Sequence, residues 1–248
     1  MLKVNSLVKS FGGLLAIDKL SFQVETGQLH AVIGPNGAGK TTLISQISGE
    51  LKPDSGTIFF DGNDISETPI HLRSELGLAR SFQITNIFLE MTTWDNVALA
   101  VQAQTGHSFH FWKDARKEPN LREPALEFLK QVGLEERNNI LAGQLSHGEQ
   151  RQLEIAMALA TRPKMLLLDE PMAGMGPEES NAMVKILLGL KRKLTILLIE
   201  HDMDVVFTLA DMITVLVYGR GIATDSPDAI RNNPEVQAAY LGEEEDRA

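Results

Sequence analysis

The most constraining feature of this sequence is a glycine-rich stretch, GPNGAGKT, that runs from Gly34 to Thr41. It fits the pattern G-x-x-x-x-G-K-[ST], follows an aliphatic run that suits a strand (29–33), and precedes a segment that suits a helix. With average residue usage, such a match arises by chance in a chain of this length on the order of once in a hundred cases. Glycines let backbone N–H groups converge on phosphate oxygens, and a helix N-terminus adds partial positive charge. The stretch therefore predicts a nucleoside triphosphate site, with a plain glycine turn as the alternative.

Four residues are expected to carry the chemistry of this site. We expect Lys40 to reach the β- and γ-phosphates and the Thr41 hydroxyl to hold Mg²⁺. The segment MLLLDE (165–170) predicts the second half of the site, in which Asp169 holds the metal ion through its water shell. Glu170 is then placed to polarise an attacking water. A strand that ends in Asp-Glu is common and often structural, but phosphoryl transfer needs a metal carboxylate, which favours the functional interpretation here.

The pattern of apolar residues predicts an α/β fold with an inserted helical segment. Short strands are expected at 2–8, 21–24, 29–33 and 57–60, and a helix from 40 to about 49. Aliphatic runs at 165–170, 195–201 and 213–219 do not alternate, which suits strands buried on both faces of a sheet. Between about 84 and 160, helical spacing takes over. We expect one domain with a mixed-sheet core over about 1–83 and 161–225, a helical subdomain over about 84–160, and a helical tail over about 226–248.

Composition excludes several classes of function. Lys and Arg number 23 against 33 Asp and Glu, and the net charge of −10 argues against a nucleic-acid partner. Cysteine is absent, which excludes disulfides and thiolate metal sites, and the six His show no metal-ligand spacing. The aliphatic runs are far shorter than the about 20 residues of a membrane span, and the N-terminus lacks the apolar core of a signal peptide. We therefore expect a soluble or peripheral intracellular protein.

The segment LSHGEQ (145–150) precedes an amphipathic helix that is expected to begin around Arg151. Ser146 suits the N-cap of this helix, and Gly148 permits close backbone approach. A capped helix start is one interpretation. The functional one is a second helix N-terminus that faces an anion.

The order of these motifs resembles the ATP-binding cassette (ABC) ATPases over essentially the whole chain. The matching features are the phosphate loop, Gln83, LSHGEQ, MLLLDE and His201, in that order. The resemblance implies a P-loop NTPase fold in which two cassettes pack head to tail. The signature of one cassette, here LSHGE, then closes over ATP held in the phosphate loop of the other.

The resemblance assigns a role to each matching residue. Phe11, in KSFGG, matches the aromatic that stacks on adenine, where most members carry Tyr; a core aromatic at a strand end is the alternative. Gln83 matches the glutamine that senses Mg²⁺ and the attacking water, and His201 matches the switch histidine that contacts the γ-phosphate. Catalytic roles are thus implied for Glu170, His201 and Gln83, and metal contacts for Thr41, Gln83 and Asp169. Nucleotide contacts are implied for Phe11, Gly34, Pro35, Asn36, Gly37, Ala38, Gly39, Lys40, Thr41, Thr42, Ser146, His147, Gly148 and Glu149.

Three positions depart from the usual family pattern. His147 replaces the first glycine of LSGGQ, and Glu149 replaces its glutamine. A glutamate beside a triphosphate is unfavourable unless its side chain points away. Gly176 stands where the loop after the catalytic glutamate, commonly SALD, carries aspartate, which bears on how two ATP sites of a dimer are coupled.

Within the family, the chain is similar to the LivG-like ATPases of branched-chain and hydrophobic amino-acid importers. The similar stretches are FGGLLAID, EPMAGMGPEE, IEHDMDVV and RNNPEVQAAYLGEEE. Cassettes of urea importers and lipopolysaccharide exporters look similar too, and LSHGE with EPMAGM leans towards the urea type. The resemblance implies a second cassette, identical or a sister subunit, together with membrane permeases, a periplasmic solute-binding protein, and a place on the cytoplasmic face of the inner membrane. A soluble ABC ATPase unconnected with transport and a nucleotide-binding regulator without turnover are the alternatives from other classes.

Overall fold

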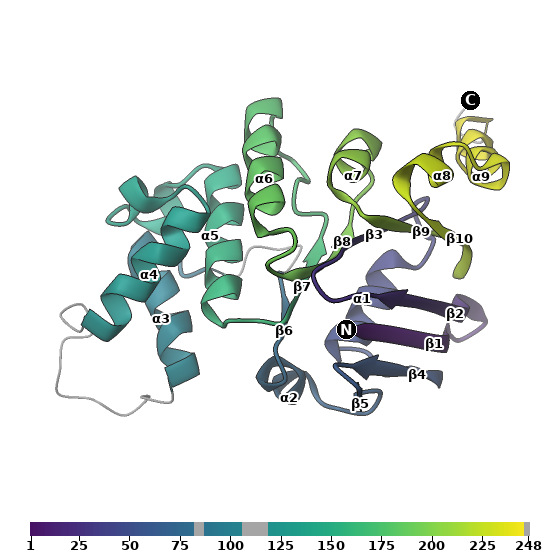
Figure 1. The fold of residues 1–248 in the computed structure, drawn as a ribbon, viewed down its shortest axis with the longest axis horizontal. Helices are drawn as coiled ribbons and strands as arrows, with labels where there is room; N and C mark the ends of the chain where they lie inside the picture. The colour runs from purple at the N-terminus through teal and green to yellow at the C-terminus, as the bar shows by residue number, and fades with distance from the viewer. Residues whose placement is uncertain (82–86, 106–118, 246–248) are drawn as a thin grey trace. The chain divides into compact units, whose positions relative to one another are not determined.

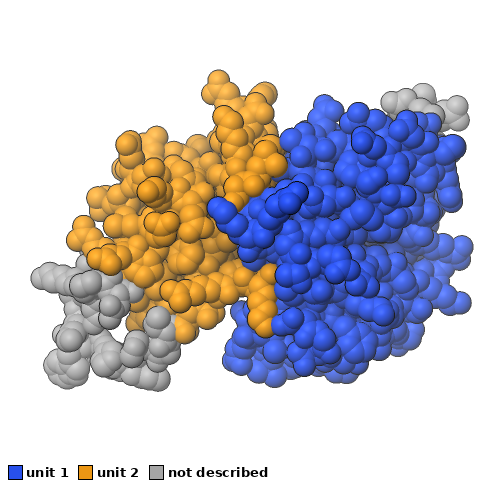
Figure 2. Space-filling model, in the orientation of Figure 1, with its two compact units in different colours: residues 1–78, 165–170, 190–248 blue, residues 79–164, 171–189 orange. Residues whose placement is uncertain are grey.

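The computed structural model describes residues 1–81, 87–105 and 119–245 (Figure 1). The chain divides into two compact units, drawn in different colours in Figure 2. The first comprises residues 1–78, 165–170 and 190–248, and the second comprises 79–164 and 171–189. Residues 171–189 thus group with the helical unit, whereas the sequence assigns them to the core. Most of these residues form helix α6 (Pro177–Leu190).

The first unit contains a largely parallel sheet with the order β10-β9-β3-β8-β7-β6. Its central strands are β3 (Leu29–Ile33), β7 (Met165–Asp169) and β8 (Thr195–Ile199), and all their residues are buried. Burial on both faces explains why these segments are aliphatic without alternation. β9 (Met212–Val217) runs parallel to β3, and β10 (Arg220–Asp225) returns antiparallel to β9. The chain leaves the first unit within β6 (Leu78–Arg80).

An antiparallel sheet with the order β2-β1-β4-β5 completes the core of this unit. It consists of β1 (Leu2–Phe11), β2 (Leu14–Val24), β4 (Ser55–Phe60) and β5 (Asn63–Asp64). β1 and β2 are longer than their sequence predicts because several β-bulges break the apolar alternation between them. Helix α1 (Lys40–Ser48) contributes Leu43, Ile44 and Ile47 to the core that also contains side chains of both sheets.

A buried guanidinium holds the C-terminal end of α1. Arg73, in helix α2 (Ile70–Glu75), is 2% exposed and donates to the carbonyl oxygens of Gln46 (2.7 Å) and Ile47 (2.8 Å). A cation at the C-terminus of a helix satisfies carbonyl groups that lack intrahelical partners and complements the helix dipole. The same unit ends in helices α7 (Met203–Leu209), α8 (Pro227–Arg231) and α9 (Pro234–Glu245).

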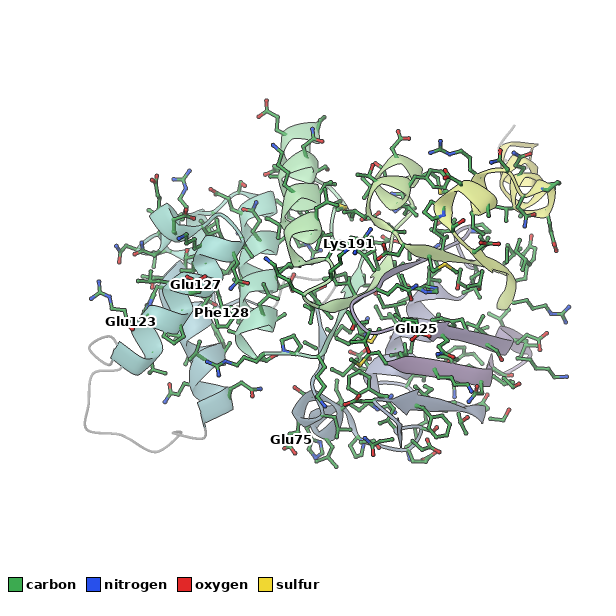
Figure 3. All side chains as sticks on the ribbon, in the orientation of Figure 1. Glu25, Glu75, Glu123, Glu127, Phe128 and Lys191 are labelled. Atoms are coloured by element: carbon green, nitrogen blue, oxygen red, sulfur yellow. The ribbon has the colours of Figure 1, made fainter. Side chains whose placement is uncertain are left out.

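The second unit is helical. It contains α3 (Thr93–Thr105), α4 (Pro119–Gln131), α5 (His147–Ala160) and α6 (Pro177–Leu190), with short 3₁₀ turns at Glu135–Arg137 and Ala142–Gln144. Helices α3, α4 and α5 pack on one another, and each contains a fully buried aliphatic residue, Val97, Leu129 and Leu153 respectively. Glu123 and Glu127, one turn apart on α4, are exposed (Figure 3). Among the described helices, none is long and apolar enough to cross a membrane.

Candidate functional site

The glycine-rich stretch forms a loop between the end of β3 and the start of α1. Gly39 is the N-cap of α1 and has φ of +105°, a left-handed conformation that favours glycine. A Cβ atom at this position would lie 2.4 Å from the backbone oxygen of Ala16, so no larger residue fits. The first-turn amides of α1 have no intrahelical acceptors, and they open onto the loop as donors for an anion.

The ammonium group of Lys40 is bound by carbonyl oxygens of the glycine-rich loop. The Lys40 side chain is 7% exposed, and its Nζ donates to the backbone oxygens of Gly34 (2.6 Å) and Pro35 (2.9 Å). Thr41 is exposed in the first turn of α1, and Thr42 is partly buried. The loop therefore places one ammonium group and the amides of a helix N-terminus at the same end of α1.

The turn between β9 and β10 fastens this loop to the rest of the unit. The amide of Gly219 donates to the Ala38 oxygen (2.9 Å), and the Gly219 oxygen accepts from the amide of Asp18 (2.9 Å). No local pattern in the sequence predicts this contact, because Gly219 lies far from Ala38 in the chain and its turn carries no phosphate-binding pattern.

The strand ends next to the loop bring the candidate catalytic residues together. β3, β8 and β7 are adjacent and parallel, so the residues that follow them meet at one edge of the sheet. Asp169 ends β7 and is 2% exposed, whereas the Glu170 side chain is 24% exposed. His201 follows β8, and its Nδ1 lies 3.9 Å from Oε1 of Glu170. Glu170 has φ of +47°, a strained conformation for a non-glycine residue.

Glu200 is a third acidic group at this edge that the sequence analysis did not single out. Its Oε2 accepts from the amide of His201 (3.0 Å) and lies 3.7 Å from the Nδ1 of the same residue. The Glu200 side chain is 1% exposed, so Nδ1 of the imidazole lies within 4 Å of a buried carboxylate and also of the Glu170 carboxylate. The order Ile-Glu-His at the end of a strand is the sequence pattern that indicates an acidic group next to His201.

The donor set at the strand ends fits a magnesium ion bound mainly by phosphates and water. In the described part of the chain, no group of three or more His, Cys, Asp or Glu side chains is arranged to hold a metal. One carboxylate, that of Asp169, and one hydroxyl, that of Thr41, are the predicted protein ligands. Mg²⁺ keeps several waters and needs only one or two carboxylates when a nucleotide supplies phosphate oxygens.

Phe11 ends β1 and is exposed rather than part of the core. Its exposed fraction is 48%, which rules out the alternative of a buried strand-end aromatic. The Lys9 Nζ lies 5.7 Å from the centre of the Phe11 ring and 2.7 Å from Oδ1 of Asp54. The distance falls within the range of a cation–π interaction. Phe11 thus offers an accessible ring face for stacking.

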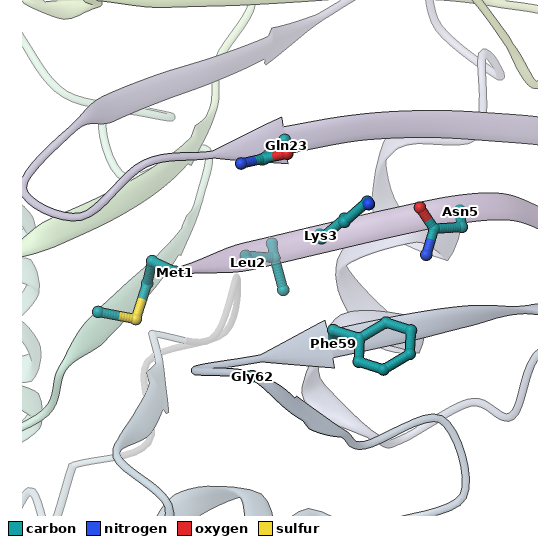
Figure 4. Close-up of a pocket in the computed structure, with 7 residues that line it drawn as sticks. All are labelled: Met1, Leu2, Lys3, Asn5, Gln23, Phe59 and Gly62. Atoms are coloured by element: carbon teal, nitrogen blue, oxygen red, sulfur yellow. The ribbon is translucent and has the colours of Figure 1, made fainter.

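A separate hollow of about 270 Å³ lies on the antiparallel sheet of the first unit (Figure 4). It contains none of the predicted site residues and has no acidic side chain in its lining, which consists of Met1, Leu2, Lys3, Asn5, Gln23, Phe59 and Gly62. No chemistry related to phosphate transfer follows from this composition.

The signature segment forms the N-terminus of α5 in the second unit. Ser146 is the N-cap, and its Oγ accepts from the amide of Glu149 (3.2 Å), while Oε2 of Glu149 accepts from the amide of Ser146 (2.9 Å). This reciprocal pair is a capping box, and it confirms the predicted N-cap. The helix begins at His147, earlier than the start predicted near Arg151. The other carboxylate oxygen of Glu149 accepts from Nε of Arg137 (3.0 Å), so this acidic group is already engaged within its own unit.

The predicted site residues therefore fall into two groups. The phosphate loop, Asp169, Glu170 and His201 come together in the first unit, and residues 146–149 lie in the second. Gln83 lies outside the described residues. The individual roles of these residues in nucleotide binding and catalysis stay predictions.

Comparison with known proteins identifies the family. The sequence profile of the ABC transporter family matches residues 17–173, more than half of the chain. The chain belongs to the ABC transporter ATP-binding cassette family. A second profile, described as the branched-chain amino acid ATP-binding cassette transporter, matches residues 222–246 of this cassette, where α8 and α9 lie.

Curated relatives and solved structures match the ABC cassette over nearly its whole length. It is 40% identical over 250 residues to the high-affinity branched-chain amino acid transport ATP-binding protein BraF of Pseudomonas aeruginosa, covering 98% of both chains. It is 38% identical over 254 residues to LivG of Escherichia coli, with the same coverage. A nucleotide-free cassette from an ABC transporter superposes with a TM-score of 0.84 at 34% identity, covering 97% of this chain and 98% of that one. The ADP conformation of an ABC transporter cassette superposes with a TM-score of 0.85 at 33% sequence identity, covering 98% of each chain. The predicted family, α/β cassette fold and ATPase class are confirmed.

Proposed function

We propose that this ABC cassette energises the uptake of branched-chain or other hydrophobic amino acids through partner permeases. The observation that carries the proposal is similarity over 98% of both chains to proteins named for branched-chain amino acid transport. The match of residues 222–246 to the branched-chain profile also supports it, because this segment lies outside the phosphate loop and the strand ends. The urea-importer alternative rests on LSHGE and EPMAGM alone.

The first unit supplies the groups that bind ATP. The amides at the N-terminus of α1 and the Lys40 ammonium neutralise the phosphate oxygens, and Phe11 stacks on adenine. Thr41 and Asp169 hold Mg²⁺, which neutralises negative charge on the β- and γ-phosphates when it is bound. Gln83 is assigned to the same metal and to the attacking water by resemblance.

The strand ends supply the groups that hydrolyse ATP. Glu170 orients a water and accepts its proton as the water attacks the γ-phosphorus. The bond from this phosphorus to the β–γ bridging oxygen breaks in the same reaction, and ADP leaves. His201 donates to a γ-phosphate oxygen while the buried carboxylate of Glu200 holds its imidazole in place. The 3.9 Å between Nδ1 of His201 and Oε1 of Glu170 lets both side chains act on the same phosphate.

The second unit supplies the contact with a partner cassette. Ser146, His147 and Gly148 at the start of α5 contact the ATP held by the other cassette, and Glu149 completes the helix cap. Membrane permeases transmit the closure of the two cassettes, and a periplasmic binding protein delivers the solute. This places the chain on the cytoplasmic face of the inner membrane, bound there through the permeases.

Transport by the reconstituted complex tests the proposal. The cassette, its sister cassette and the permeases are inserted into liposomes with ATP inside, and the solute-binding protein is added outside. We expect ATP-dependent uptake of radiolabelled leucine or valine that the Lys40→Ala variant of this cassette abolishes. Uptake of urea without uptake of either amino acid would refute the proposed solute and identify urea in its place.

A further inference from the structure

The carboxylate of Glu179 joins the N-termini of two helices in the second unit. Oε1 accepts from the Ser146 hydroxyl (2.8 Å) and from the amide of Gly148 (3.2 Å), both at the start of α5. Oε2 accepts from the amide of Gly176 (3.3 Å), which precedes α6. Hydrogen bonds from Ser146 and then from Gly176 lower the pKa of this carboxyl group, with smaller contributions from Gly148 and His147. Glu179 is therefore an anion at neutral pH.

The absence of a side chain at position 148 makes room for this carboxylate at the start of α5. A Cβ atom at position 148 would lie 2.6 Å from Cδ and 2.7 Å from Oε1 of Glu179. Gly148 therefore lets the carboxylate reach both the amide and the Ser146 hydroxyl. The other acidic residue of the signature does not compete for this place, because both Glu149 oxygens are bound elsewhere, to the amide of Ser146 and to Arg137.

The donors that Glu179 occupies are the ones that the proposed function assigns to the triphosphate of a partner cassette. A serine hydroxyl has one proton to donate, and a backbone amide likewise has one. A phosphate oxygen and the carboxylate therefore compete for the Ser146 hydroxyl and the Gly148 amide. A carboxylate that stays beside the triphosphate opposes binding by charge repulsion as well.

We propose that Glu179 is an internal competitor of the partner's triphosphate for the signature of this cassette. The inference rests on the proposed function and adds a residue that sets the affinity of the signature for ATP. In the separate chain, Glu179 satisfies the two donors at the start of α5. When two cassettes close on MgATP, the carboxylate gives up these donors, and the need to displace it raises the MgATP concentration at which closure occurs.

A purely structural role for Glu179 predicts the opposite result. Glu179 stands three residues after Gly176, where a glutamate commonly bonds back to the amide that precedes a helix. If capping were its only role, its removal would loosen the start of α6 and the signature, and closure would need more MgATP. The direction of the change therefore separates the two roles.

The experiment measures MgATP-dependent dimerisation by light scattering in a Glu170→Gln background, where ATP persists. Glu179→Gln keeps the size of the side chain and removes its charge, and Glu179→Ala removes the competitor. Glu178→Gln, which neutralises the neighbouring residue in the same turn, is the matched control. Because hydrogen bonds to a charged group are about twice as strong as neutral ones, we expect Glu179→Gln to lower the half-maximal MgATP concentration about three- to tenfold. The Glu178→Gln control is expected to have the same half-maximal MgATP concentration as the Glu170→Gln parent.

Each outcome decides between the alternatives. An unchanged or higher MgATP requirement in both Glu179 variants, with unaltered thermal melting, overturns the inference. If Glu179→Ala melts at a lower temperature than its parent, only the MgATP requirement of Glu179→Gln is used to test the inference. The Gln side chain retains an acceptor for the helix amides. If the Glu170→Gln parent fails to dimerise even when a sister cassette is added, the proposed function fails and the inference fails with it. A parent that dimerises while the Glu179 variants do not shift its midpoint refutes the inference alone.

Discussion

Nδ1 of His201 lies 3.9 Å from Oε1 of Glu170, although 31 positions separate the two residues in the chain. The contact exists because β7 and β8 are neighbouring parallel strands in which Asp169 pairs with Ile199. Each strand then delivers its next residues to the same edge of the sheet, beside the phosphate loop that follows β3. The pairing of β7 with β8 therefore fixes the spacing of the candidate base and the candidate γ-phosphate ligand.

Lys40→Ala is expected to weaken MgATP binding about 10- to 100-fold. The variant keeps the loop amides but loses a charge-assisted hydrogen bond to the phosphates, which contributes about 1.5–3 kcal/mol. Isothermal titration of the purified cassette measures the change. Lys52→Ala is the control, because the Lys52 side chain is 71% exposed and pairs with the exposed Glu67. Equal affinities for the wild type and Lys40→Ala would refute the phosphate-loop assignment.

Phe11→Ala is expected to weaken ATP binding by about 0.5–1.5 kcal/mol, whereas Phe11→Tyr is expected to bind ATP with nearly the wild-type affinity. The exposed ring contributes little to the core, so neither variant should change the melting temperature. Leu14→Ala is the control, because Leu14 is exposed and pairs with Phe11 across the β1–β2 hairpin. Titration of the three variants with ATP checks this prediction. Equal losses for Ala and Tyr at position 11 would indicate a packing role.

Local patterns in the sequence predict the central strands and the residues attached to their ends. β3, β7 and β8 are uniformly aliphatic, so their positions and the place of Asp169 follow from the sequence. The strand β10 and the full lengths of β1 and β2 do not follow, because bulges and exposed residues interrupt their alternation. Such strands are defined by pairing with distant partners rather than by their own composition.

The contacts that complete the candidate site are also non-local. Gly219 binds the phosphate loop but belongs to no motif, and Glu179 binds the signature although its stretch, EPMAGMGPEE, indicates only a family resemblance. The environment of Glu149 is a second feature that its local sequence does not predict. Its sequence position predicts an unfavourable charge near a triphosphate, and the structure instead pairs it with Arg137, twelve residues earlier. Which carboxylate occupies the signature depends on how α5 and α6 pack, and no single segment encodes that packing.

Acid is expected to destabilise the cassette through His30. This histidine, in β3, is 0% exposed, and burial lowers its pKa from 6.5 to about 4. The unfolded chain therefore binds a proton that the folded chain does not bind between pH 6.5 and about 4. The free energy of unfolding falls as the pH drops through this window, by about 3 kcal/mol in total.

Urea unfolding at pH 7 and pH 4.5 measures this effect. His30→Gln removes the titrating group and should show a smaller loss of stability on acidification, although the variant is less stable at pH 7 because the Nε2 contact to Thr214 (2.8 Å) changes. His71→Gln, at an exposed position, should behave like the wild type. Identical pH dependence in the His30 and His71 variants would contradict the prediction.

Glu170→Gln is expected to retain ATP binding while turnover falls about 10²–10⁴-fold. The substitution keeps the size of the side chain, so it should preserve the left-handed backbone at this position and the hydrogen bond that the amide of residue 170 donates to the Ile199 oxygen (2.9 Å). It removes only the basic charge beside His201. ATP that binds and persists should then hold two cassettes together, since each triphosphate is contacted from both sides.

Phosphate release and light scattering, with and without MgATP, check both parts of this prediction. Glu67→Gln neutralises an exposed carboxylate of the same unit and should leave turnover unchanged. His201→Ala provides the comparison at the other member of the pair. It removes a contact to the γ-phosphate but leaves the base, so we expect slower turnover without complete loss. If Glu170→Gln released phosphate at the wild-type rate, Glu170 would not be the base, and Glu200, the buried carboxylate 3.7 Å from the His201 Nδ1, would be the next candidate at this edge of the sheet.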